Sequence, residues 1–261
     1  MNILDRIVAY KQIEVAAQEK TVPLALLQQQ PAYHRKTNSL CEAIRTGTGI
    51  IAEFKRKSPS KGIINDKLSP QEVTQGYVKA GASGLSVLTD VHFFGGSPQD
   101  LQIARLYNPT TPILRKEFVI NAYQLHEAKA MGADVILLIA ACLSPAQSTE
   151  LAALAHELGL EVLLEVHDLT ELQAHAHIGA DLIGVNNRNL KTFEVDLNIS
   201  AELAPKIPAK AIKVAESGIH THQEMEWLKK VGFQGFLIGE SFMKTPNPEV
   251  ALAEFLKPVG V

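Results

Sequence analysis

Short apolar runs alternate with helix-like segments along most of the chain. Eight runs rich in apolar and β-branched residues occupy positions 50–54, 84–88, 113–115, 134–139, 161–166, 181–185, 211–215 and 235–238. Helix-like segments separate them, for example at 69–80, 122–131, 144–158 and 221–231. Strands that are almost continuously apolar and alternate with helices are typical of a parallel sheet covered on both faces. The pattern therefore predicts an α/β protein.

The number of units favours a closed sheet over an open one. Eight strand–helix units within residues 48–261 predict a (β/α)8 barrel, the TIM-barrel fold. An open nucleotide-binding sheet would be expected to carry G-x-G-x-x-G after its first strand, and the sequence there reads KRKSPSKG. Glycine ends several helix-like segments, as a left-handed helix cap requires.

Residues 1–47 stand outside this rhythm. Helices are expected at 3–19, 22–30 and 40–45, forming an N-terminal helical extension that packs on the barrel. Two roles remain open for it. It either shields the barrel or forms part of the wall over an active site.

Composition and charge exclude several classes of partner. The chain is 46% hydrophobic with a formal net charge of −3, which does not favour nucleic-acid or membrane-surface binding. Its two cysteines, Cys41 and Cys142, are too few for a disulfide framework or a cysteine metal cluster, and no HExxH-like spacing occurs among the histidines. The apolar stretch 135–143 is too short to span a bilayer, and the N-terminus lacks a signal-peptide core. We expect a cytoplasmic protein without a bound metal.

Charged residues directly follow the first apolar run, in IIAEFKRKSPSKG. Alternate strand residues share a face, so an inward Ile51 implies that Glu53 and Lys55 also point inward. In these barrels the catalytic residues lie at the carboxyl ends of the strands. An inward carboxylate and ammonium at that end therefore indicate a catalytic site.

Further strands repeat this arrangement. The inward candidates at the ends of the third, fifth, sixth and seventh strands are Lys116, Phe118, Glu165, Asn186, Arg188, Glu216 and Ser217. Unpaired buried ions cost several kcal/mol, so one alternative is that these groups only form structural ion pairs. Their common location at strand ends favours catalysis instead.

Two glycine-containing turns indicate a phosphate site. ESGI follows the seventh strand and IGES the eighth, and each leads into a helix whose N-terminal N–H groups suit an anion. Phosphate sites in these barrels recur at these two loops. Lys55 and Ser58 could complete the site, although a solvated basic loop is the alternative for Lys55, Arg56 and Lys57. Phe93 and Phe94 follow the second strand and, with Phe118, could form a wall for a flat ring.

Seven blocks together resemble the indole-3-glycerol phosphate synthase family: IIAEFKRKSPSKG, LTDVHFFGGS, ILRKEFVIN, LLEVHD, IGVNNRNL, VAESGI and FLIGESFM. The resemblance covers essentially the whole chain. It implies a carboxy-lyase of tryptophan biosynthesis that acts without a cofactor on 1-(2-carboxyphenylamino)-1-deoxyribulose 5-phosphate, a phosphosugar joined to anthranilate. Ring closure, decarboxylation and dehydration would give indole-3-glycerol phosphate.

The resemblance also implies roles for individual residues. The catalytic set it implies is Glu53, Lys55, Lys116, Glu165, Asn186 and Ser217. For the phosphate it implies Lys55, Ser58, Gly218, Gly239 and the backbone of Glu240. For the ring it implies Phe94, Phe118, Leu137 and Leu190, and for the substrate carboxylate Arg56 and Arg188. Glu216, at the same strand ends, is a further binding residue. Many relatives carry Ser where this chain has Glu240, and a carboxylate turned toward the phosphate would weaken its binding.

The chemistry requires such groups, because the ketone oxygen must be protonated as the ring closes and the last step needs an acid and a base. We assign Lys116 to ring closure and Glu165 to dehydration. The alternatives are a phosphoribosylanthranilate isomerase, for which the cysteines are poorly placed, a Schiff-base aldolase using Lys116, and a non-catalytic phospholigand sensor. A monomer or weak homo-oligomer is expected.

Overall fold

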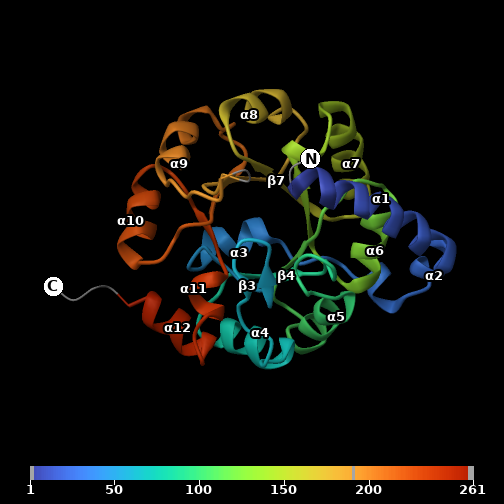
Figure 1. The fold of residues 1–261 in the computed structure, drawn as a ribbon, viewed down its shortest axis with the longest axis horizontal. Helices are drawn as coiled ribbons and strands as arrows, with labels where there is room; N and C mark the ends of the chain where they lie inside the picture. Colours follow the sequence, from blue (N-terminus) through green and yellow to red (C-terminus); the bar gives the residue numbers. More distant parts are fainter. Residues whose placement is uncertain (1–2, 190–191, 258–261) are drawn as a thin grey trace.

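Eight parallel strands form a closed barrel in the computed structural model, which describes residues 3–189 and 192–257. The barrel order is β1-β10-β9-β8-β7-β6-β5-β4, with β4 pairing back to β1 (Figure 1). The strands are β1 (Ile50–Phe54), β4 (Gly84–Leu88), β5 (Ile113–Lys116), β6 (Val135–Ile139), β7 (Glu161–Val166), β8 (Leu182–Asn186), β9 (Ile212–Glu216) and β10 (Gly235–Ile238). The predicted barrel is confirmed, and the expected strand limits differ from these by at most one residue.

A ring of helices surrounds the strands (Figure 1). It comprises α4 (Pro70–Lys79), α5 (Pro98–Tyr107), α6 (Tyr123–Met131), α7 (Pro145–Glu157), α8 (Leu169–His175), α9 (Asn198–Leu203), α10 (His222–Lys230), α11 (Glu240–Met243) and α12 (Pro248–Phe255), with 3-10 turns η2 (Ala140–Cys142) and η3 (Ala204–Lys206). Ser69, Ser144 and Thr221 cap α4, α7 and α10 through capping boxes. Each satisfies N–H groups that the first turn leaves unpaired, which fixes where the helix begins.

The apolar side chains form two layers. Ile50, Ala52 and Phe54 point outward and belong to the layer between strands and helices. Ile51 points inward and packs with residues from the other strands, including Leu114 and Leu163. This alternation directs Glu53 and Lys55 along the inner side of the barrel, as the sequence predicted.

The N-terminal extension contacts both ends of the barrel. It consists of α1 (Ile3–Thr21), α2 (Leu24–Gln28), η1 (Pro31–His34) and α3 (Leu40–Thr46). Leu40, Cys41 and Ile44 of α3 pack into the inner layer, whereas α1 crosses the opposite end of the barrel toward α6 (Figure 1). The two roles considered for residues 1–47 are therefore divided between α3 and α1. The second helix is shorter than expected because Pro23 precedes it and lacks the N–H of a helix interior.

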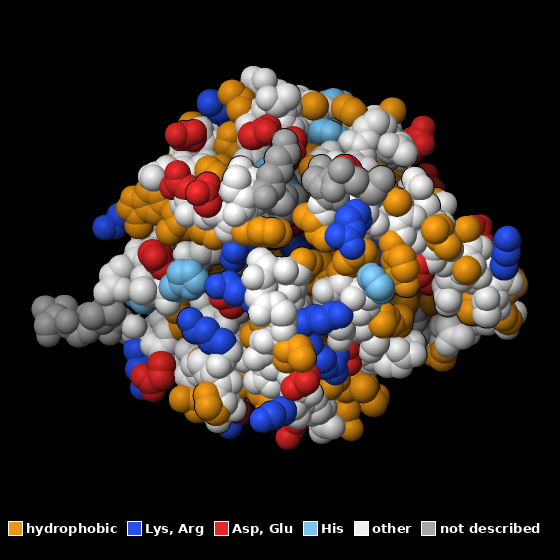
Figure 2. Space-filling model, in the orientation of Figure 1, with side chains coloured by type: hydrophobic (Ala, Val, Ile, Leu, Met, Phe, Trp, Pro, Cys, Tyr) orange, Lys and Arg blue, Asp and Glu red, His pale blue; other side chains and the backbone are white. Residues whose placement is uncertain are grey.

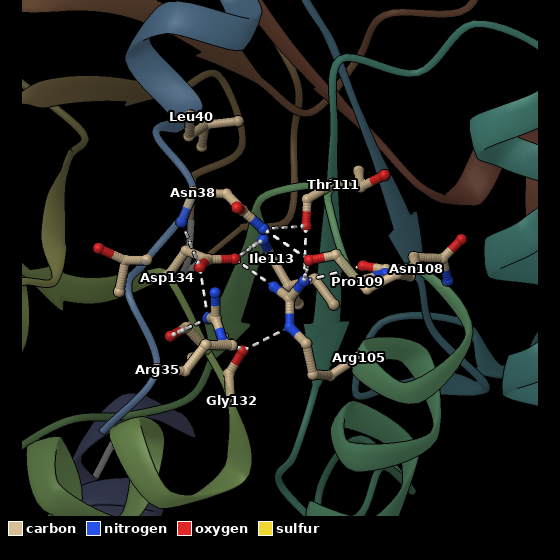
Figure 3. A network of polar contacts seen from close by, with 12 residues as sticks. Arg35, Asn38, Leu40, Arg105, Asn108, Pro109, Thr111, Ile113, Gly132 and Asp134 are labelled. Carbon is tan, nitrogen blue, oxygen red and sulfur yellow. Dashed lines mark hydrogen bonds and ion pairs between the residues drawn. The ribbon is translucent and has the colours of Figure 1, made fainter. Parts of the chain in front are cut away.

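A buried carboxylate fixes the segment between η1 and α3. Asp134 is fully buried just before β6 and forms ion pairs with Arg35 and Arg105 (Figure 3). It also accepts the backbone N–H groups of Asn38 and Ile113, each at 2.8 Å. Asp134 therefore cross-links the N-terminal extension to the barrel.

The loop after β1 contains a two-stranded hairpin that the sequence did not predict. β2 (Lys57–Ser58) pairs antiparallel with β3 (Gly62–Ile63), which gives the SPSKG segment a defined shape.

No helix among the described residues combines the length and apolarity required to cross a bilayer.

Candidate active site

A cavity of about 190 Å³ opens at the carboxyl ends of the barrel strands. Lys and Arg side chains gather around the middle of the face that contains it (Figure 2). The lining contains most residues expected from the sequence: Glu53, Lys55, Ser58, Phe94, Lys116, Phe118, Leu137, Glu165, Asn186, Arg188, Glu216, Ser217, Gly218, Gly239 and Glu240. These residues come from all eight barrel strands or the loops that follow them, so closure of the barrel brings them together.

Lys116 lies at the centre of the charged part of the cavity. Its Nζ is 2.9 Å from Glu165 Oε2 and 2.7 Å from Glu216 Oε2. Asn186 donates from Nδ2 to Glu165 Oε1 at 3.0 Å, which orients that carboxylate. Gly184 leaves room for the cluster, because a Cβ there would lie 2.1 Å from Glu216 Oε1.

Burial and neighbouring charges shift the pKa values of these three groups in different directions. Burial lowers the pKa of Lys116, but Glu165 and Glu216 outweigh it and the pKa is raised. Burial opposes ionisation of Glu165, but Lys116 and His167 outweigh it and hold its pKa well below the usual range. The pKa of Glu216 shifts in the opposite direction to that of Glu165. Burial and the charge of Glu165 raise this pKa to about 7, although Lys116 lowers it. The cavity thus holds an ammonium, an ionised carboxylate and a carboxyl that titrates near neutrality.

A second ion pair lies beside this cluster. Lys55 Nζ is 2.6 Å from Glu53 Oε1, and Ser86 donates to Glu53 Oε2 at 3.3 Å. Gly239 is required next to them, because a Cβ there would lie 2.7 Å from Glu53 Oε1. This pair supplies another ammonium and carboxylate facing the same cavity.

His167 extends the cluster away from the cavity. Its Nε2 lies 3.3 Å from Glu165 Oε1, and its Nδ1 lies 3.1 Å from Glu171 Oε2. Burial lowers the pKa of His167, but the two carboxylates outweigh it and raise the pKa to about 10. No pattern in the sequence assigned a role to His167.

The opposite end of the cavity has the features of an anion site. Ser217 and Gly218 both have positive φ, 65° and 78°, which exposes backbone at the end of β9. Gly239 forms the N-cap of α11 without a side-chain hydrogen bond. Ser58 and Lys55 line the same cavity from the β1 loop. The two glycine turns singled out in the sequence are therefore brought together.

The carboxylate of Glu240 does not turn away from this site. It lines the cavity and lies 3.6 Å from both Lys61 Nζ and Arg188 Nη2. Two cations thus offset its negative charge. Arg188 also donates to the carbonyl of Phe193 at 3.2 Å, which holds the guanidinium at the cavity edge.

Aromatic residues line the remaining side. The rings of Phe94 and Phe118 are 5.8 Å apart with an angle of 38° between their planes. Leu137 lines the cavity with them, whereas Phe93 packs against Tyr10 and His92. Phe94 and Phe118 thus form an aromatic wall of the cavity, and Phe93 does not contribute to it.

The structure places one expected binding residue elsewhere. Both Nη atoms of Arg56 pair with Asp100, and the guanidinium stacks over Phe54 at 4.8 Å. Arg56 does not line the cavity, because the alternation that directs Lys55 inward directs the next residue outward. We therefore do not retain Arg56 as a partner of the substrate carboxylate. Leu190, expected in the ring pocket, lies outside the described residues.

Part of the wall comes from α1, a role that the sequence left open for the N-terminal extension without indicating which residues would line the site. Ile3, Leu4 and Ile7 line the cavity. The spacing of Ile3, Ile7 and Lys11 is typical of one helix face, but periodicity does not indicate what that face covers. Among the described residues, no three His, Cys, Asp or Glu side chains are arranged to hold a metal ion. The expected absence of a metal stays a prediction.

The fold and the cavity define a (β/α)8-barrel enzyme with an acid–base cluster next to an anion site. A family model described as indole-3-glycerol phosphate synthase matches residues 4–255. The chain is 48% identical over 259 residues to an indole-3-glycerol phosphate synthase from Bacteroides thetaiotaomicron, covering 99% of each chain. It is 44% identical to one from Paracidovorax citrulli, covering 97% of this chain and 98% of the other. The chain therefore belongs to the indole-3-glycerol phosphate synthase family.

Membership gives the chain the activity of a carboxy-lyase that forms indole-3-glycerol phosphate in tryptophan biosynthesis. Solved structures support the fold alone. A 3-hexulose-6-phosphate synthase from Salmonella typhimurium matches with a TM-score of 0.63 at 13% identity, over 80% of this chain and 98% of that one. A chain of the tryptophan synthase complex from Pyrococcus furiosus matches with a TM-score of 0.60 at 16% identity, over 80% and 96%.

Proposed function

We propose that Lys116 is the general acid of ring closure. The aromatic carbon attacks the ketone carbon of the substrate, and Lys116 gives a proton to the ketone oxygen as the new bond forms. Its raised pKa keeps the amine protonated in the free enzyme, so the donor is present when the substrate binds. Loss of carbon dioxide then restores the aromatic ring. A proton placed in this way typically contributes about 10²–10⁴ in rate.

Glu165 serves the dehydration that follows. Its lowered pKa keeps it ionised, so it accepts the proton removed from the new ring while the hydroxyl leaves as water. Lys55, held by Glu53, donates to the leaving oxygen. Asn186 keeps Glu165 in position through its 3.0 Å hydrogen bond. Ring closure thus uses Lys116 as its acid, and dehydration uses Glu165 as base with Lys55 as acid.

The substrate is held at its two ends. Its phosphate binds at Ser217, Gly218, Gly239 and the backbone of Glu240, with Lys55 and Ser58. Its ring lies against Phe94, Phe118 and Leu137, and its carboxylate faces Arg188. This orientation presents the ketone to Lys116. Binding at both ends of the substrate thus aligns the reacting atoms.

The placement of Lys116 between Glu165 and Glu216 is the observation that carries this proposal. It also disfavours a Schiff-base aldolase, because a nucleophilic lysine must be neutral and these carboxylates raise the pKa of Lys116. The chain is further proposed to act in the cytoplasm, without a cofactor, as a monomer or weak homo-oligomer.

Substrate labelled in its carboxyl carbon separates the two steps. Release of labelled carbon dioxide reports ring closure and decarboxylation, and indole fluorescence reports dehydration. Lys116→Met is expected to lose both signals, whereas Glu165→Gln should release carbon dioxide in a first turnover without matching fluorescence. Lys206→Met, at an exposed lysine, is the control and should keep both. Near-normal turnover in Lys116→Met, or parallel loss of both signals in Glu165→Gln, would contradict the assigned roles.

A further inference from the structure

A buried lysine on α1 has no role in the reaction described above. Ile7, Lys11 and Val15 form the buried stripe of α1, at i, i+4 and i+8. Lys11 is only 2% exposed, although the other two members of the stripe are aliphatic. A buried ammonium is costly unless it is paired, so its contacts indicate why it is there.

Lys11 is paired with carboxylates from two different barrel loops. Its Nζ lies 3.0 Å from Asp90 Oδ2, after β4, and 2.9 Å from Glu117 Oε1, after β5. It also pairs with Glu14 of its own helix. Burial lowers the pKa of Lys11, but Glu117 and Asp90 outweigh it, so the pKa is raised and the group remains charged.

The same two carboxylates hold the backbone of the aromatic wall. Asp90 Oδ1 accepts the backbone N–H of Phe94 at 2.9 Å. Glu117 Oε1 accepts the backbone N–H of Phe118 at 2.9 Å. Asp90 is fully buried and Glu117 is 3% exposed, so solvent does not compensate for either charge. Arg115 lies 3.9 Å from Glu117 Oε2, whereas Lys11 contacts both carboxylates and so reduces the repulsion between the two loops.

Lys11 also connects α1, which covers the cavity, to the loops after β4 and β5. Ile7 lies one turn before it and lines the cavity, together with Ile3 and Leu4. Figure 1 shows α1 crossing this end of the barrel. One ammonium thus connects the apolar cover of the cavity to both phenylalanines of its wall.

We propose that Lys11 is a positioning residue for the aromatic ring of the substrate. It sets the relative positions of Phe94, Phe118 and the α1 cover, and so contributes to affinity at the ring end of the site. The phosphate end is formed by the loops after β9 and β10, which Lys11 does not contact. The proposal rests on the assigned ring and phosphate ends, and turnover by the wild-type enzyme tests the reaction separately.

Ligands with and without the ring distinguish positioning from general stability. Binding of indole-3-glycerol phosphate and of ribulose 5-phosphate, which lacks the ring, is measured for the wild type, Lys11→Met and Lys11→Arg. We expect Lys11→Met to weaken binding of the ring-containing ligand by about tenfold or more and of the ring-free ligand by less than about twofold. KM for the substrate should rise more than kcat falls. Lys11→Arg retains the charge and should recover part of the lost affinity.

Lys20→Met is the matched control, because Lys20 is an exposed lysine of the same helix. It should leave both affinities and both kinetic constants unchanged. Equal losses for the two ligands in Lys11→Met would overturn the proposal and leave Lys11 a purely structural role. Unchanged ring affinity would also overturn it. If Lys11→Met does not fold, Lys11→Arg decides, since a changed ratio of the two affinities supports positioning and an unchanged ratio contradicts it.

Discussion

Glu216 lies 2.7 Å from Lys116 at the centre of the cavity, yet its carboxyl titrates near neutrality. A lysine at this distance normally favours the ionised form of a carboxyl. Here burial and the nearby Glu165 have the larger effect, and the pKa of Glu216 is raised to about 7 from an ordinary value of 4.5. One ammonium between two carboxylates is therefore not sufficient to keep both ionised.

Stability should depend on pH through Glu216. In the unfolded chain Glu216 loses its proton near pH 4.5, whereas the folded protein retains it until about pH 7. The folded state therefore binds more protons between these values, and this contribution to stability falls as pH rises. Relative to Glu216→Gln, the wild type should lose up to about 3 kcal/mol of unfolding free energy between pH 4.5 and 7, at about 1.4 kcal/mol for each pKa unit. Urea unfolding at several pH values checks this, and a difference that is constant with pH would contradict it.

His167 should influence the acidic limb of the pH–rate profile. Its pKa of about 10 keeps it charged, and that charge helps to hold the pKa of Glu165 down. Lys116 and Asn186 also contact Glu165, so His167→Gln should not abolish activity. We expect the acidic limb of kcat to move up by about one pH unit, since a neighbouring opposite charge typically has an effect of this order.

A matched histidine is available as a control. His156 is also paired with a carboxylate, Asp181, but is 41% exposed in its side chain. His156→Gln should leave the pH–rate profile unchanged. A profile of His167→Gln that superimposes on the wild type would show that His167 does not act on Glu165.

Asp134→Ala should reduce stability without altering substrate affinity. The substitution leaves two arginines without their buried partner, at the end of the barrel opposite the cavity (Figure 3). Breaking a buried ion pair typically costs about 3–5 kcal/mol. Glu254→Ala is the control, because its exposed pair with Lys257 should contribute no more than about 1 kcal/mol. Denaturant unfolding and KM are measured for both, and a large change in KM with little loss of stability would refute this expectation.

Glu240→Gln should strengthen binding of the phosphate end. The substitution removes a negative charge from the cavity and frees Lys61 and Arg188, each 3.6 Å from the carboxylate. We expect KM to fall about two- to fivefold at low salt, since partly exposed ion pairs contribute up to about 1 kcal/mol, and less at high salt. Glu249→Gln, which removes the pair with Lys79, should leave KM unchanged. A higher KM in Glu240→Gln would indicate that the carboxylate organises the site.

Much of the candidate site follows from position along the strands. The sequence predicted Glu53, Lys116, Glu165 and Asn186. The alternation of inward and outward side chains is a local property of each strand, and closure of the barrel preserves it. The family resemblance implied Arg56 as a partner of the substrate carboxylate, but Arg56 does not line the cavity, and its place next to the inward Lys55 indicates the outer face. Lys11 had no such signal, because a single lysine in an amphipathic helix is normally solvated.

The sequence by itself determined the barrel, the order of its strands and the end at which the charged residues meet. Eight apolar runs separated by helices can bury their backbone polar groups only in a covered parallel sheet, and alternation then decides which residues face inward. Only the tertiary structure decided that Lys116 is shared by Glu165 and Glu216, which are 49 and 100 residues further along the chain. It also decided that α1 covers the cavity and that Lys11 connects two loops. Such contacts depend on distances and competing charges between segments far apart in sequence, which no local pattern encodes.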